Sequence, residues 1–213
     1  MVASVVLPLG LLAVTAMLDY GRIVRQSTER VHRTANIAEE HALKVLETSE
    51  VIISRVLDLV GSDDDASIAA REEALHRKLR VIQRDISQVQ NIYAWSRSGD
   101  ALVSSRYYPS PRINIGDRED FEAHAGKPIG TYVTRPLVGR ASGERFFNIS
   151  RRRETPDGAF AGAVTVSLRP QYFSDFYGEL STAPGMAISI WREDGALIAR
   201  YPDHPGTVRL TPE

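Results

Sequence analysis

The sequence predicts an α+β fold in which a long N-terminal helix precedes a five-stranded antiparallel sheet with flanking helices. Three observations support this prediction. From Tyr20 to Val60 apolar residues recur at heptad spacing, and no proline interrupts them. Between residues 92 and 168, short alternating segments are separated by turns that contain Gly, Asp or Pro. After Pro170, a helix and a second, shorter hairpin follow.

The N-terminal segment Val2–Leu18 is uncharged and rich in Val, Leu and Ala. Its length is about the minimum for a membrane-spanning helix. A signal peptide would begin with basic residues, and no Lys or Arg precedes Asp19. We therefore predict a transmembrane helix over residues 1–18, with a signal-peptide core or a buried helix as the alternatives. Four arginines follow it, between Arg22 and Arg33, and the positive-inside rule would then place the remainder of the chain in the cytoplasm.

Residues 19–61 are predicted to form a stalk helix. The residues at its seam positions are small or polar near the N-terminus and have larger apolar side chains between Ile52 and Val60. We expect the far end to pack on the globular part of the chain and the near end to pair with a second copy, giving a homodimer. A stripe that packs only within its own chain is an equally good interpretation. The heptad positions are Val24, Val31, Ala38, Val45, Ile52 and Leu59.

Residues 62–169 are predicted to form a globular domain. The segment from Gly61 to Asp65 ends the first helix and supplies acidic caps for the next. Asp117 is a natural N-cap, with Asp120 in the position of a capping-box acid. The expected elements are a helix over 66–88, strands over 92–95 and 102–105, a helix begun at Asp117, and strands over 130–138, 146–151 and 160–168.

Residues 170–213 contain an expected connector helix over 171–180 and a hairpin formed by 186–191 and 196–201. This hairpin repeats features of the first one. Trp191 corresponds to Trp95, and the turn at Gly195 corresponds to the turn at Gly99. We therefore predict the start of a second, similar unit, whose sheet is incomplete at Glu213.

The order of these motifs resembles the double Cache (dCache, PAS-like) periplasmic sensor domains of bacterial histidine kinases, diguanylate cyclases and chemoreceptors. The segments that carry the resemblance are YAWSRSGDALVSS, DREDF, GRASGERFFNISRRR, GAVTVSLRPQYFSDFY and ARYP. The resemblance implies that the membrane-distal unit, residues 62–169, binds a small molecule between its sheet and the loop and helix that cover it. It also implies a kinase or cyclase output domain downstream, and residues 170–213 as an incomplete membrane-proximal unit.

In this family the sensor domain is periplasmic and anchored in the inner membrane. We prefer that orientation to the one the arginine pattern indicates, on the interpretation that an upstream cytoplasmic segment is missing from this chain. Two alternatives remain open: a ligand-free PAS-like domain that acts as a dimerisation module, and the sensor domain of a chemoreceptor.

The sequence gives no indication of an enzyme. It contains no phosphate-binding loop, kinase signature or nucleophile elbow. Its 5 histidines lack metal-ligand spacing, and it has no cysteine, so neither a metal nor a cofactor is expected. Basic residues are mixed with acids and the net charge is −1, which argues against nucleic acid as a partner.

The candidate ligand-binding residues surround the helix that begins near Asp117. Arg118 is the main candidate, because a guanidinium beside helix N–H groups suits a carboxylate or phosphate. The alternative is that Arg118 pairs with Asp120 or Glu122 on a solvated helix. Aromatic walls and a few polar groups are typical of pockets. The other candidates are Tyr93, Trp95, Tyr132, Phe147 and Ser167.

The amino-acid-binding branch of the family carries an Arg-x-Trp-Tyr motif, a Tyr-x-Asp motif on the next strand and an Asp at the end of the last strand. Arg118 matches the arginine, but the groups that would hold an ammonium are absent. The resemblance therefore implies a small anionic or neutral ligand rather than an amino acid. The residues that stand at the other motif positions are Asp120, Phe121, Leu137, Gly139 and Ser167.

Overall fold

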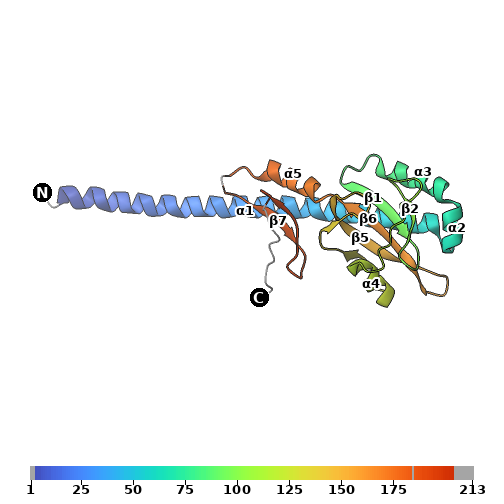
Figure 1. Cartoon of the computed structure of the whole chain (residues 1–213). Coiled ribbons are helices and arrows are strands. Elements are labelled where there is room, and N and C mark those ends of the chain that lie inside the picture. The colour runs from blue at the N-terminus through green and yellow to red at the C-terminus, as the bar shows by residue number, and fades with distance from the viewer. Residues whose placement is uncertain (1–2, 184, 204–213) are drawn as a thin grey trace. The chain divides into compact units, whose positions relative to one another are not determined.

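The computed structural model describes residues 3–183 and 185–203 (Figure 1). The chain divides into two compact units, residues 1–41 and 42–213. Helix α1, Ala3–Val60, is continuous over 58 residues, as predicted for its Tyr20–Val60 part. The predicted membrane anchor begins at Val2, outside the described residues. Within the described part of the chain, no helix contains a segment long and apolar enough to cross a membrane.

The apolar seam of α1 changes its environment along the helix. Val24 and Val31 are 46% and 58% exposed, whereas Val45 and Ile52 are 3% and 4% exposed. The far end of the seam therefore packs within its own chain, as predicted, because burying these side chains removes apolar surface from water. Pairing of the exposed near end with a second copy stays a prediction.

The single helix predicted over 66–88 is two helices, α2 (Asp65–Ala70) and α3 (Glu72–Gln83). Asp64 caps α2, since its Oδ1 accepts a hydrogen bond from the Ser67 N–H at 2.7 Å. Arg71 separates the two helices with a non-helical φ of −104°. The predicted helix was too long at its C-terminal end because the chain turns after residue 83 and enters the sheet at Val89.

The central sheet has six strands in the order β2-β1-β6-β5-β3, with β4 also paired to β5, and every pairing is antiparallel. Five strands were predicted. The difference lies in the segment 130–138, which forms two short strands that pair with separate parts of β5 on either side of Pro136. The strands are β1 Val89–Trp95, β2 Ala101–Ser104, β3 Tyr132–Val133, β4 Leu137–Val138, β5 Arg145–Glu154 and β6 Phe160–Leu168.

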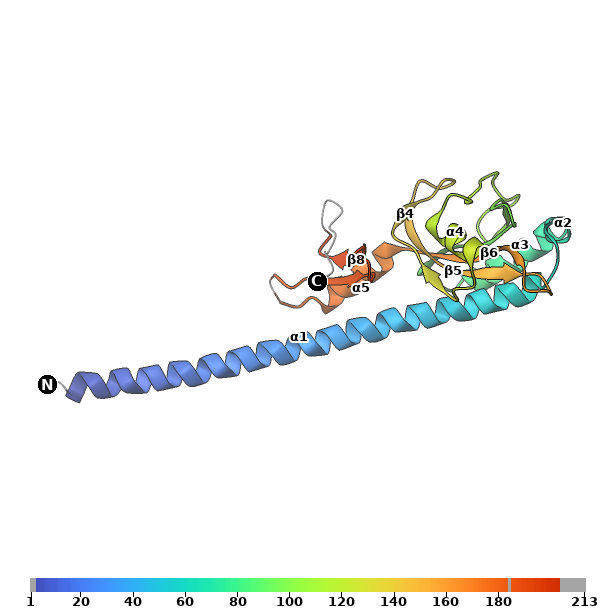
Figure 2. The same ribbon diagram turned by 90° about the horizontal axis from the view of Figure 1, so that it is seen from below.

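The two faces of the sheet differ in character. On one face, Ile92, Val166 and Ile149 lie side by side across β1, β6 and β5, and the far end of α1 covers this face (Figure 2). The Arg151 side chain of β5 donates to Ser54 Oγ of α1 at 3.1 Å. The other face carries α4, Glu119–Gly126, and the loops around it (Figure 2).

After β6, helix α5 (Pro170–Leu180) leads to the second hairpin, β7 (Ile188–Trp191) and β8 (Leu197–Tyr201). Phe173 of α5 is 1% exposed and contacts Phe147 of β5, with ring centroids 5.7 Å apart. Gly178 allows the Tyr201 ring to pack on α5, since a Cβ at Gly178 would lie 3.0 Å from that ring. The predicted second hairpin is therefore present in the described part of the chain.

A buried arginine links the turn after α1 to the sheet. Arg153 of β5 is 2% exposed. Its guanidinium donates to the Trp95 carbonyl at 2.8 Å, to the Asp63 carbonyl at 3.1 Å and to Asp65 Oδ1 at 3.2 Å. A buried cation is tolerated only where acceptors replace its lost water, and these groups provide that replacement for the two terminal nitrogens of the guanidinium.

We expect Arg153→Ala to lower the free energy of unfolding by about 1–3 kcal/mol, because the change leaves the Trp95 carbonyl, in a buried hydrogen bond, without its donor. Arg145→Ala on the same strand is the matched control; Arg145 is exposed, and we expect a change below about 0.5 kcal/mol. Urea-induced unfolding of the full chain, followed by circular dichroism, measures both. Equal losses in the two variants would contradict this account of Arg153.

Candidate ligand-binding site

A cavity of about 50 Å³ lies on the α4 side of the sheet. That volume has room for a few water molecules. Its floor is formed by β1, β6 and β5, and its walls by the loop before α4 and by the loop Gly139–Ser142. The cavity therefore occupies the place predicted for the ligand, between the sheet and the segments that cover it.

Four of the six predicted ligand-binding residues line this cavity: Tyr93, Trp95, Arg118 and Ser167. The Tyr93 and Trp95 rings stack with centroids 4.5 Å apart, and Trp95 Nε1 donates to Thr165 Oγ1 at 2.9 Å. Because both rings are fixed by these contacts, they form a rigid aromatic wall.

Phe147 and Tyr132 do not line the cavity. Phe147 pairs with Leu168 in the register of β5 and β6, so its side chain lies on the opposite face of the sheet, against Phe173. Its neighbours Phe146 and Asn148 line the cavity instead. Tyr132 lies at the edge strand β3, where the Arg192 guanidinium stands 5.6 Å from its ring centroid.

The floor of the cavity is a polar row that crosses three strands. Asn91, Ser167 and Asn148 lie opposite one another in the register, and Ser167 Oγ donates to Asn148 Oδ1 at 2.8 Å. Asn91 Oδ1 accepts from the hydroxyls of Ser104 and Ser105 at 3.0 and 2.9 Å. These bonds fix the orientation of the Asn91 amide, and Asn91 lines the cavity.

Sequence reasoning missed Asn91 and Asn148. The signal that could have revealed Asn91 is its position two residues before Tyr93 and four before Trp95, on the same face of one strand. No comparable local signal existed for Asn148, because the register of β5 decides its position. Other lining residues that were not predicted are Arg106, Tyr107, Ile113, Ile115, Arg140 and Thr165.

Three arginines line the cavity, and two of them are paired with acids. Arg106 pairs with Glu144 at 2.5 Å, and this bond, with one from Gln90, lowers the pKa of Glu144 to about 2. Arg140 pairs with Asp117 at 2.6 Å, and its guanidinium lowers the pKa of that carboxyl group. Both pairs attach the loop between β4 and β5 across the cavity mouth.

Asp117 is therefore not the N-cap that the sequence predicted. Its carboxylate binds Arg140, and the N-cap position of α4 is occupied by Arg118, without a side-chain cap bond. The competing ion pair, from a residue 23 positions away, prevails over the local capping chemistry.

Arg118 forms no ion pair with any residue that the structure describes. Its Nη2 donates to the Val138 carbonyl at 3.0 Å, and its guanidinium lies 6.0 Å from the Phe146 ring centroid. Burial, and secondly the charge of Arg140, lowers the pKa of Arg118. The expected alternative, an ion pair with Asp120 or Glu122, does not form in this structure.

Asp120 lies behind the floor of the cavity. It is 1% exposed, and its Oδ2 accepts a hydrogen bond from Asn148 Nδ2 at 3.1 Å. Burial raises its pKa, although the bond from Asn148 acts in the opposite direction. Asp120 therefore orients the Asn148 amide rather than serving as the capping-box acid that was predicted. In the described ranges, no group of three or more His, Asp or Glu side chains could hold a metal ion.

The fold of this chain is similar to those of solved extracellular and ligand-binding domains of histidine kinases and chemoreceptors. The resemblance to double Cache sensor domains is thereby confirmed. The extracellular domain of rpHK1S-Z16, a protein assigned as a histidine kinase, is 26% identical to this chain, with a TM-score of 0.63. The match covers 82% of this chain and 71% of that one.

Two further solved structures share the fold at lower identity. The ligand-binding domain of the Campylobacter jejuni chemoreceptor Tlp3, in complex with L-valine, is 12% identical with a TM-score of 0.61, over 85% of this chain and 72% of that one. The sensor domain of the V. cholerae histidine kinase DctB is 13% identical with a TM-score of 0.59, over 85% and 68%. No model of a protein family and no curated protein matches the sequence.

We expect the stability of Asp120→Asn relative to the wild type to increase as pH rises from acid to neutral, because burial penalises the ionised form of the Asp120 carboxyl group. The folded-state pKa of Asp120 is raised above its ordinary value of 3.8. The stability that this group contributes is therefore present below pH 3.8 and is lost as pH rises through the raised pKa. Urea unfolding of both proteins across this range measures the difference. A difference that does not change with pH would contradict the assignment.

Proposed function

We propose that the chain is the extracytoplasmic sensor module of a membrane-bound bacterial receptor, and that the cavity binds a small anionic or neutral molecule through Arg118. The observation that carries this proposal is the contrast between the three cavity arginines. Arg106 and Arg140 already have acidic partners, whereas Arg118 has only a backbone carbonyl among the described residues. Its remaining donors suit a carboxylate or phosphate oxygen.

The rest of the lining favours the same ligand class. Among the described residues, those that line the cavity include three arginines and no acid. An ammonium buried there without a carboxylate would be disfavoured by several kcal/mol. The Asn91 and Asn148 amides give the floor polar groups, and the Tyr93 and Trp95 rings offer an apolar wall. An organic acid with a short apolar body fits these groups.

Ligand binding would act by shifting a population of conformations. The ligand that bridges Arg118 to the floor would hold the start of α4 and the loop Gly139–Ser142 against the sheet. The proposal includes a receptor output of the kinase or cyclase type. It also includes a membrane anchor at Val2–Leu18, which is supported by the uncharged apolar sequence of that segment.

This proposal has three alternatives: an amino-acid ligand, a ligand-free dimerisation domain and a chemoreceptor sensor domain. An amino-acid ligand is favoured by the similar chemoreceptor domain solved with L-valine and by the Asp120 carboxyl group behind Asn148. A ligand-free dimerisation domain would need a fully packed core on this side of the sheet, which the cavity argues against. A chemoreceptor sensor domain would use the same cavity with a different output.

We expect a thermal-shift screen of the full chain against organic acids, purines and amino acids to give its largest stabilisation with an organic acid. Arg118→Ala should weaken that ligand, because losing a buried charge-assisted pair costs roughly 2–5 kcal/mol. Arg112→Ala, an exposed arginine in the preceding loop, is the matched control and should leave binding unchanged.

The screen has two outcomes that would overturn this proposal. A largest shift with an amino acid would show that the missing acids do not decide the ligand class. An organic acid that Arg118→Ala binds as tightly as the wild type would show that Arg118 is not the anchor.

We further expect the exposed near end of α1 to pair with a second copy in the membrane. The chain has no cysteine, so Val31→Cys introduces a single thiol on the seam. Oxidation of membranes that contain this variant should give a disulfide-linked dimer on a non-reducing gel. Arg30→Cys, next to it but off the seam, should crosslink less. Equal crosslinking at both positions would contradict a seam-directed dimer.

A further inference from the structure

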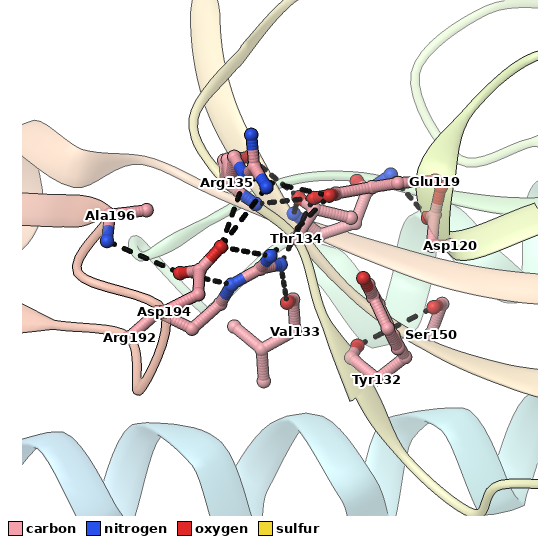
Figure 3. A network of polar contacts seen from close by, with 11 residues as sticks. Glu119, Asp120, Tyr132, Val133, Thr134, Arg135, Ser150, Arg192, Asp194 and Ala196 are labelled. Carbon is pink, nitrogen blue, oxygen red and sulfur yellow. Dashed lines mark hydrogen bonds and ion pairs between the residues drawn. The ribbon is translucent and has the colours of Figure 1, made fainter. Parts of the chain in front are cut away.

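A network of charged side chains joins α4 to the turn of the second hairpin (Figure 3). Its members are Glu119 at the start of α4, Arg135 after β3, and Arg192 and Asp194 in the β7–β8 turn. Arg192 Nη1 donates to Glu119 Oε1 at 3.1 Å and to the Val133 carbonyl at 2.9 Å. Arg135 bridges the two acids, with its backbone N–H donating to Glu119 Oε1 at 2.7 Å and its Nη2 3.1 Å from Asp194 Oδ2.

The hairpin end of this network is held in a fixed geometry. Arg192 binds both carboxylate oxygens of Asp194, through Nε at 2.9 Å and Nη2 at 2.7 Å. Asp194 Oδ1 also accepts from the Ala196 N–H at 3.2 Å, and these bonds lower the pKa of Asp194. The Arg192 side chain is only 19% exposed, so solvent screens its bonds less than those of a surface pair.

The other end of the network adjoins the cavity. Glu119 follows directly after Arg118, and the two side chains lead to different partners. Arg118 lines the cavity and contacts the Val138 carbonyl, whereas Glu119 binds Arg135 and Arg192. A change in the position of the Arg118 backbone therefore also moves the carboxylate on which the hairpin turn depends.

We propose that Glu119 is a positioning residue, which sets the place of Arg118 at the cavity and couples occupation of the cavity to the β7–β8 hairpin through Arg192. This inference rests on the proposed function of the cavity as a ligand site. It proposes that the hydrogen bonds and ion pairs among Glu119, Arg135, Arg192 and Asp194 regulate that site. By reciprocity, a carboxylate that fixes Arg118 should also order the hairpin turn.

The first test needs no ligand. Amide hydrogen exchange of the full chain is compared for wild type, Arg192→Gln and Glu119→Gln. We expect Arg192→Gln to raise exchange in residues 119–126 by about tenfold, and Glu119→Gln to do the same in residues 192–196, as expected for losing charge-assisted bonds. Glu193→Gln and Glu122→Gln are the matched controls, since each removes an exposed charge from the same turn or the same helix.

The second test places a carboxylate at the cavity without an identified ligand. Ser142 lines the cavity, and its Oγ accepts a hydrogen bond from the Glu144 N–H at 3.2 Å, which an Asp or Asn side chain can also do. We expect Ser142→Asp to lower exchange in residues 192–196 relative to Ser142→Asn. In a Glu119→Gln background, Ser142→Asp and Ser142→Asn should give the same exchange in residues 192–196. If Glu119 has a purely structural role, the exchange difference between Ser142→Asp and Ser142→Asn should persist in that background.

The outcomes separate this inference from the proposed function. Two results would overturn the coupling even if the organic-acid screen succeeds. One is unchanged hydrogen exchange in α4 for Arg192→Gln. The other is an exchange difference between Ser142→Asp and Ser142→Asn that is equal with and without Glu119. Raised exchange in both directions, with an Asp–Asn difference that depends on Glu119, would support the coupling. A failed screen in that case would refute only the identity of the cavity as an anion site.

Discussion

The structure depends on one constraint: the central strand β6 is buried on both faces. Val164, Val166 and Leu168 face one side and Thr165 and Ser167 the other, and none of them is more than 5% exposed. Because side chains alternate along a strand, this burial requires an apolar cover, α1, on one side and satisfied polar partners on the other. The polar row of the cavity floor is thus a consequence of how the sheet is covered.

Local pattern was sufficient to predict most of the fold. Alternation and turn chemistry located β6 at its observed bounds, and the absence of breakers predicted the continuity of α1. Local pattern could not show which side chains of β5 face the cavity. The sequence shows that Phe147 and Asn148 point in opposite directions, but only the pairing of Phe147 with Leu168 and of Asn148 with Ser167 shows which one reaches the cavity. That register is a long-range property.

Sequence reasoning also could not identify the ion-pair partners of charged residues. Asp117 has the local features of an N-cap, yet Arg140, far along the chain, binds its carboxylate. Glu119 and Arg192 are separated by 73 positions, and no periodicity relates them. Arg118 was predicted because its position at the start of a helix is a local feature. The ion pairs that distinguish Arg118 from Arg106 and Arg140 were accessible only in three dimensions.

The distribution of these interactions explains how the loop over the cavity can move while the sheet stays folded. The sheet is held by buried apolar rows and by buried groups such as Arg153, which are costly to disrupt. The cavity mouth is held by the pairs Arg106–Glu144 and Arg140–Asp117, whose side chains are roughly one-third to two-thirds exposed. Exposed pairs contribute little stability and are screened by salt. The loop over the cavity can therefore open at a small cost while the sheet stays intact.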